Sequence, residues 1–143
     1  MKVFTCVDNA GGMSFNNRRQ SKDAKVYESI VSIVSGRGEE PVLRIAPYSI
    51  PLFQETSGLH LLVADDFLAQ AGPGDYCFVE TPALKNFEDK IDTIFVFRWN
   101  RDYPADTIFP LDLTGSDWSL TGAWEFKGKS HEKITLEKYE RRK

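Results

Sequence analysis

The chain has 143 residues, of which 41% are hydrophobic and 27% are charged, and its formal net charge is -3. This length fits a single domain, residues 1–143, with a core that needs no metal ion or disulfide. The weak negative charge gives no electrostatic case for nucleic-acid binding, and no apolar run approaches the roughly 20 residues of a membrane span. We therefore expect a cytoplasmic protein whose partner is a small molecule or another protein.

Cysteine and histidine are too sparse to predict a metal site. Cys6 and Cys77 each lie within an apolar run, which predicts two buried free thiols. His60 and His131 occur singly, and the polar neighbours of His131 predict an exposed residue in a hairpin turn. Because the His-x-His-x-Asp-His cluster is absent, we do not expect a zinc nuclease of the ribonuclease Z type.

In chain order, the first half of the sequence alternates between strands and helices. Lys2–Val7 predicts a central strand, and a polar loop over residues 8–20 follows it. Ser21 is a candidate N-cap for an amphipathic helix over Lys22–Ser35. Further strands are expected over Pro41–Ile45, Leu59–Val63 and Tyr76–Val79, with short helical segments over Tyr48–Phe53 and Asp65–Ala71.

The second half predicts a buried strand and a terminal hairpin. Thr81-Pro82 is a typical helix start, and that helix is expected to run to Glu88. Ile94–Phe97 is a continuous apolar run, which predicts a strand covered on both faces. The last strand is predicted over Lys133–Arg141, and a turn over residues 127–130 pairs it with the strand before it. In that preceding strand, alternate residues are expected on one face: Trp118, Leu120, Gly122, Trp124 and Phe126. The elements together predict an α/β fold: a mostly parallel central sheet, a C-terminal antiparallel hairpin and about four flanking helices.

The order of these segments resembles the dihydrofolate reductase family along the whole chain. Val7-Asp8, then Gly12-Met13, then Asp23 at a helix start resemble the first strand, the mobile loop and the substrate-binding acid of that family. The later part of the resemblance rests on Phe78-Val79, Asp92–Val96, Asp106–Pro110, Asp117-Trp118 and Tyr139–Arg142. The resemblance implies a dihydrofolate-reductase-like fold.

The resemblance also implies a substrate pocket, with Asp23 in the catalytic, substrate-binding role. The residues that would line this pocket with Asp23 are Phe4, Thr5, Cys6, Tyr27, Val79 and Phe97. From the residues alone, Asp23 is also compatible with a first-turn acid that suits the helix dipole.

Several positions depart from the family pattern. Glu80-Thr81-Pro82 stands where the family has a Gly-Gly pair that lets the backbone approach the cofactor phosphates, and a carboxylate there repels phosphate. Phe97 replaces a threonine that hydrogen-bonds to the acid, and Asn17-Arg18-Arg19 replaces Leu-Pro-Trp. We therefore expect no cofactor, with NADPH retained only if the protein is a reductase.

The leading interpretation is a non-catalytic or divergent dihydrofolate-reductase-like protein that binds a pterin-like or nucleotide-like molecule in a cleft near Asp23. The alternatives are a reductase with altered cofactor use and a protein-interaction module of the immunity or antitoxin type. A set of arginines either converges on an anion, with aromatic stacking nearby, or consists of separate solvated residues: Arg18, Arg19, Arg44, Arg98 and Arg101.

Overall fold

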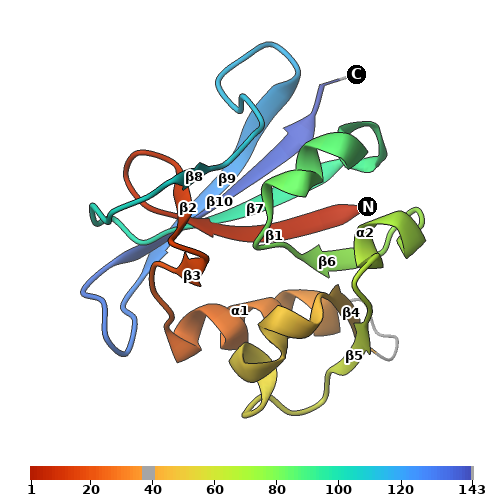
Figure 1. Ribbon diagram of the computed structural model, residues 1–143, viewed down its shortest axis with the longest axis horizontal. Helices are drawn as coiled ribbons and strands as arrows, with labels where there is room; N and C mark the ends of the chain where they lie inside the picture. Colours follow the sequence, from red (N-terminus) through yellow and green to blue (C-terminus); the bar gives the residue numbers. More distant parts are fainter. Residues whose placement is uncertain (37–40, 143) are drawn as a thin grey trace.

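The computed structural model describes residues 1–36 and 41–142, and within them a seven-stranded sheet has the order β5-β4-β6-β1-β7-β10-β9 (Figure 1). The strands that run parallel are β1 (Lys2–Val7), β4 (Val42–Ile45), β5 (His60–Val63), β6 (Tyr76–Phe78) and β7 (Thr93–Arg98). The strand β10 (Ile134–Arg141) is antiparallel to both β7 and β9 (Trp118–Phe126). The predicted mostly parallel sheet with a C-terminal antiparallel hairpin is confirmed.

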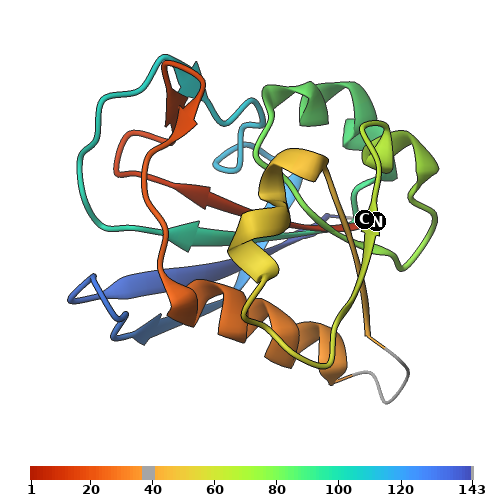
Figure 2. The ribbon, with the colours of Figure 1, turned by 60° about the horizontal axis from the view of Figure 1, so that its bottom comes forward.

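Helices cover both faces of this sheet. The helix α1 (Ala24–Ser35) and the 3-10 helix η1 (Pro47–Phe53) lie on one face, whereas α2 (Phe67–Gln70) and the 3-10 helix η2 (Pro82–Lys90) lie on the other (Figures 1 and 2). Among the described residues, no helix is long and apolar enough to cross a membrane.

Burial on both faces explains the continuous apolar run of β7. Ile94 and Val96 pack on the side of α2 and η2, while Phe95 and Phe97 pack on the side of α1 and η1. Each of these side chains is at most 6% exposed, and full burial of one such side chain contributes about 1.5–3 kcal/mol. This strand therefore anchors both halves of the core.

The segment expected to be a polar loop, residues 8–20, contains a small hairpin. The strand β2 (Gly12–Phe15) pairs with β3 (Arg18–Arg19) and with β8 (Thr107–Ile108) in a second sheet. Asn16 and Asn17 form the two-residue turn with φ values of 55° and 62°. Asparagine tolerates this left-handed conformation, which hairpin turns of two residues require, so the prediction of a plain loop was wrong.

The helix α1 begins later than the sequence predicted. Asp23, and not Ser21, is the N-cap: its backbone is extended and its side chain accepts a hydrogen bond of 3.0 Å from the Lys25 N–H. The predicted cap at Thr81 is confirmed, since its hydroxyl accepts from the Ala83 N–H at 3.2 Å.

The strand β9 does not keep one apolar face. Its register against β10 shifts between Lys138 and Tyr139, so Thr121 has no opposite residue. Such a β-bulge reverses the alternation of side chains. Leu120 consequently faces the side of α2 with Tyr139, while Trp124 faces the side of α1 with Leu136, and the predicted single face was wrong.

Candidate functional site

The carboxylate of Asp23 is wholly buried and is surrounded by donors. Its Oδ1 accepts from the N–H groups of Lys25 and Lys129, both at 3.0 Å. Its Oδ2 lies 2.9 Å from the Ser130 N–H, 3.2 Å from the Ser130 hydroxyl and 2.9 Å from Nδ1 of His131. Burial alone would raise the pKa of Asp23, but the hydrogen bonds outweigh it and hold that pKa well below the usual range of a carboxyl.

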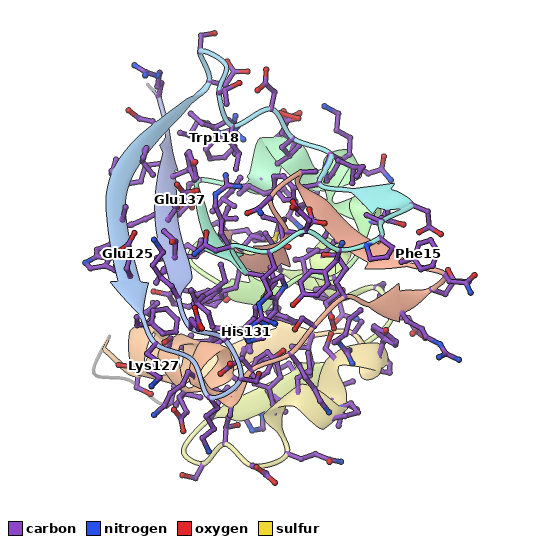
Figure 3. All side chains as sticks on the ribbon, turned by 90° about the vertical axis from the view of Figure 1, so that its left-hand side faces the viewer. Phe15, Trp118, Glu125, Lys127, His131 and Glu137 are labelled. Carbon is purple, nitrogen blue, oxygen red and sulfur yellow. The ribbon has the colours of Figure 1, made fainter. Side chains whose placement is uncertain are left out.

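His131 belongs to this buried cluster and is not the exposed hairpin residue that the sequence predicted. It is only 4% exposed, and its ring stacks on Trp99 with a centroid distance of 4.7 Å. Its Nε2 lies 2.9 Å from the hydroxyl of Ser21. Figure 3 shows His131 on the turn between β9 and β10, close to the start of α1. Polar neighbours in sequence suggested exposure, but the tertiary contact with Asp23 decides its position.

The β9–β10 turn, residues 127–131, closes tightly over Asp23. A Cβ atom on Gly128 would lie 2.4 Å from Oδ2 of Asp23 and 2.9 Å from Cδ1 of Ile134. Contacts that short do not occur between real atoms, so a larger residue would push the turn away. Glycine at position 128 is thus a condition for the donors of Lys129 and Ser130 to reach the carboxylate.

A second polar cluster lies at the carboxyl ends of the central strands, where α/β folds bind ligands. Glu80 follows β6, and its carboxylate receives two parallel hydrogen bonds from Arg19, of 2.7 and 2.9 Å. The Ser49 hydroxyl donates to the same carboxylate at 2.7 Å. The Arg19 guanidinium also lies 4.4 Å from the ring centre of Tyr48, and its hydrogen bond to Glu80 raises the pKa of Arg19. We call these four residues the Arg19–Glu80 cluster.

Two cavities flank the start of α1. The α1 cleft is open, has a volume of about 500 Å³, and lies between α1 and η1; its lining includes Asp23, Ala24, Tyr27, Glu28, Leu52 and Glu55. The inner hollow has about 10 Å³ of free space, room for about one water molecule. Its lining includes Cys6, Arg19, Ser21, Tyr27, Glu80 and Trp99. Tyr27 forms a wall of both cavities.

The structure brings only some of the expected pocket residues together. Tyr27 lines both cavities, Asp23 lines the α1 cleft, and Cys6 and Val79 line the inner hollow. Three others lie in the core and line neither cavity: Phe4, Thr5 and Phe97.

Strand alternation separates two neighbouring members of this set. Thr5 faces the side of α2, as Val3 and Val7 of the same strand do. Phe4 and Cys6 face the side of α1. The Thr5 hydroxyl is buried without a hydrogen-bond partner. Thr5 and Cys6 therefore present their side chains to opposite faces of the sheet.

The two cysteines are free, as expected, but only Cys77 is fully buried. Burial raises the pKa of Cys77 to about 12. The Cys6 side chain is half-buried. Its removal from water, and after that the nearby Glu80 carboxylate, raises the pKa of Cys6 well above the usual value of a thiol. Neither thiol has the depressed pKa of a reactive cysteine.

The arginines do not converge on one site. Arg44 pairs with Asp75 at 3.0 Å, and Arg98 pairs with Glu137. Arg101 donates to the Ser130 carbonyl at 3.3 Å, and Arg18 and Arg19 line a common groove. The five arginines are therefore separate, but the expectation that all of them are solvated was wrong, because Arg19, Arg44 and Arg98 are half-buried in ion pairs. Within the described residues, no three metal-ligating side chains cluster.

Comparison with known proteins identifies the fold. No family model and no curated protein matches the sequence. Among solved structures, a dihydrofolate reductase from Enterococcus faecalis, described as complexed with NADP(H) and RAB-propyl, matches with a TM-score of 0.67. The match covers 99% of this chain and 96% of that one at 10% sequence identity. The chain thus has the dihydrofolate reductase fold, as the resemblance implied.

Sequence reasoning missed the two features that define the site. His131 gave no local signal, because its partner Asp23 is 108 positions away. Glu80 was recognised as a departure from the family pattern, but its partner Arg19 was not, since nothing in the sequence relates residues 61 positions apart. The one available clue was the tight Lys127–Ser130 turn, whose glycine permits the close approach to Asp23.

Proposed function

We propose that this protein binds a pterin-like or nucleotide-like small molecule in the α1 cleft and does not carry out NADPH-dependent reduction. The observation that carries the proposal is the α1 cleft itself. Its volume of about 500 Å³ is that of a small-ligand site, and it adjoins Asp23 and Tyr27. Because the fold is that of dihydrofolate reductase, we propose that the planar ring of the ligand binds in this cleft.

The lining of the α1 cleft suits a ring with polar edges. Tyr27 and Leu52 provide apolar surface, and Lys22, Glu28 and Glu55 place charges of both signs around it. The Asp23 carboxylate already accepts hydrogen bonds from five donor groups. A ligand would therefore contact Asp23 directly only after the β9–β10 turn moves, and it would otherwise bind through the remaining lining.

The Arg19–Glu80 cluster supports the proposal that no dinucleotide is used. Its carboxylate occupies the position where the resemblance places a glycine beside the cofactor phosphates. Here Glu80 holds Arg19 and Ser49 from two other segments. A phosphate entering this place would have to displace a bidentate ion pair and then lie beside Glu80. On this proposal the protein is a divergent, ligand-binding member of the fold; the earlier alternative of a reductase with altered cofactor use is its competitor.

A thermal-shift panel tests the proposal with dihydrofolate, simple pterins, nucleotides and NADPH. A ligand present at a hundredfold excess over its Kd should raise the Tm by about 5–10 °C. Ala24→Trp, which fills the α1 cleft, should remove the shift, whereas Ser32→Trp on the exposed side of α1 should keep it. Absence of any shift at millimolar ligand, or oxidation of NADPH with dihydrofolate, would contradict the proposal.

A protein-interaction role is the second candidate, because an edge strand exposes large apolar side chains. Leu120 and Trp124 on β9 are each 52% exposed. Exposed apolar surface on a sheet edge favours association. Light scattering of the purified protein and of Trp124→Ser tests this role: a complex that Trp124→Ser dissociates would support it, and a monomer at all concentrations would remove self-association from consideration.

A further inference from the structure

Three side chains at the start of α1 form a continuous line of hydrogen bonds. The Ser21 Oγ lies 2.9 Å from Nε2 of His131, and Nδ1 of the same ring lies 2.9 Å from Oδ2 of Asp23. The stacked indole of Trp99, inclined by 25° to the imidazole, fixes the plane of the ring. A hydroxyl, a base and an acid that orients the base are the arrangement that activates a serine nucleophile.

We propose that Ser21 is a nucleophile for short-chain carboxylic esters, with His131 as its general base and Asp23 as the residue that positions His131. This activity goes beyond the proposed ligand binding: it shares Asp23 with the α1 cleft, whereas Ser21 and His131 do not line that cleft. The Ser21 side chain is half-buried, whereas the Asp23 carboxylate at the other end of the hydrogen-bonded line is fully buried.

The charge state of Asp23 sets the tautomer of His131. An ionised carboxylate only accepts hydrogen bonds, so the ring nitrogen facing it, Nδ1, carries the proton. The other nitrogen, Nε2, then has its lone pair directed at the Ser21 hydroxyl. This is the tautomer that a general base requires.

A donor for the developing oxyanion lies next to the serine. The Tyr103 hydroxyl is 3.4 Å from Ser21 Oγ and 3.3 Å from Nε2 of His131. A tyrosine hydroxyl in this place can donate to the negatively charged oxygen of a tetrahedral intermediate. Tyr103 therefore serves both to hold the resting serine and to receive the carbonyl oxygen.

The space around Ser21 limits the substrate to small esters. Ser21 lines the inner hollow, and Tyr103 lines a neighbouring groove of about 380 Å³, the outer groove. Arg19 and Gln20 line both cavities, which places Ser21 where the two approach each other. The inner hollow has room for about one water molecule, so it accepts a short acyl group only after small movements, while the alcohol lies in the outer groove.

The reaction needs no oxidant or cofactor. As Ser21 Oγ bonds to the ester carbonyl carbon, its proton moves to Nε2 of His131. The carbon–oxygen bond of the ester then breaks, and the same proton leaves with the alcohol. A water molecule, deprotonated by Nε2, attacks the acyl-serine, releases the carboxylic acid and returns the proton to Ser21 Oγ. Two half-reactions of this kind constitute ester hydrolysis.

Fluorophosphonate labelling and p-nitrophenyl acetate hydrolysis test the proposal together. The probe should lose fluoride and form one covalent adduct on Ser21, located by peptide mass spectrometry. Wild type should hydrolyse p-nitrophenyl acetate far faster than Ser21→Ala, because the variant lacks the nucleophile and forms no acyl-enzyme. Ser32→Ala, an exposed serine on α1, should match wild type in both assays.

The Tm of Ser21→Ala, measured beside wild type, establishes that the variant is folded. A second measurement needs no variant: release of p-nitrophenol by wild type should show a burst of one equivalent, as an acyl-serine intermediate requires. An adduct on another residue, no adduct, or equal rates for wild type and folded Ser21→Ala would overturn the proposal. The three residues would then only fasten the β9–β10 turn to α1.

Discussion

Nδ1 of His131 lies 2.9 Å from Oδ2 of Asp23, although 108 positions separate the two residues in sequence. This contact joins the β9–β10 turn to the start of α1, and Lys129 and Ser130 of that turn line the α1 cleft together with Asp23. It places the acid that the family resemblance assigned to substrate binding inside a network of the protein's own donors. The shape of the candidate ligand site therefore depends on this network.

The close approach of Gly128 to Asp23 predicts a sensitive glycine. Gly128→Ala should lower the free energy of unfolding by about 2–3 kcal/mol, because the new methyl group displaces donors from a buried carboxylate. Urea unfolding measures the change. Gly36→Ala is the matched control: its Cβ would make ordinary contacts with the carbonyls of Ile33 and Ser32, at 3.5 and 3.7 Å, and its φ of -67° suits alanine, so about 0.5 kcal/mol or less is expected. Equal effects at the two glycines would contradict the packing described for the turn.

The lowered pKa of Asp23 predicts acid-sensitive stability. A carboxyl whose pKa is lower in the folded protein than in the unfolded chain stabilises the fold above the unfolded value of about 3.9. That contribution is lost as the pH falls from about 4 towards the folded value. Urea unfolding between pH 7 and pH 2.5 should show the decline, and Asp23→Asn should lower stability at pH 7 while flattening the acid slope. Asp65→Asn, at an exposed position, controls for the lost charge; an unchanged slope in Asp23→Asn would refute this account of acid sensitivity.

The Arg19–Glu80 ion pair should be strongly coupled. The two side chains are 21% and 17% exposed and meet in a bidentate geometry, so a double-mutant cycle with Arg19→Ala and Glu80→Gln should give about 1–3 kcal/mol of interaction energy. The exposed pair of Lys133 and Glu125 offers the control, with about 0.5 kcal/mol or less expected. A coupling at Arg19 and Glu80 no larger than that of the control pair would show that the cluster does not hold its three segments together.

The raised pKa values of both thiols predict slow thiol–disulfide exchange. At pH 8, Cys6 and Cys77 should react with a disulfide reagent far more slowly in the folded protein than in urea, because burial lowers their thiolate fraction and their access. Glu80→Gln should speed the reaction of Cys6 but not that of Cys77, since the Glu80 carboxylate raises the pKa of Cys6 alone. Reaction of Cys6 at the unfolded rate in wild type would show that the hollow is open.

Residues whose structure follows from local sequence were predicted well. Ile94–Phe97 is a continuous apolar run and forms a strand buried on both faces, and Thr81-Pro82 starts a helix with the expected cap. Asn16-Asn17 carried a hairpin signal that was not recognised, because both residues were interpreted only as loop-formers. Thr121 became the bulged residue of β9, which periodicity cannot reveal.

The candidate site was less predictable, because its contacts join distant segments. Asp23 was identified from the sequence, but its donors come from Lys129, Ser130 and His131 at the other end of the chain. Glu80 was identified as an obstacle to phosphate, but the sequence does not show that Arg19 neutralises it. Pairing of this kind depends on the folded backbone and leaves no pattern of spacing in the sequence.

Calorimetric titration of a pterin into the protein, with and without NADPH, tests the central claim most directly. We predict saturable binding of the pterin to wild type, loss of that binding in Ala24→Trp, retention in Ser32→Trp, and no change when NADPH is present. Binding of NADPH itself, with a pterin affinity that depends on it, would contradict the claim that the Arg19–Glu80 cluster has replaced the dinucleotide. No heat from any pterin at millimolar concentration would contradict the claim that the α1 cleft is a ligand site.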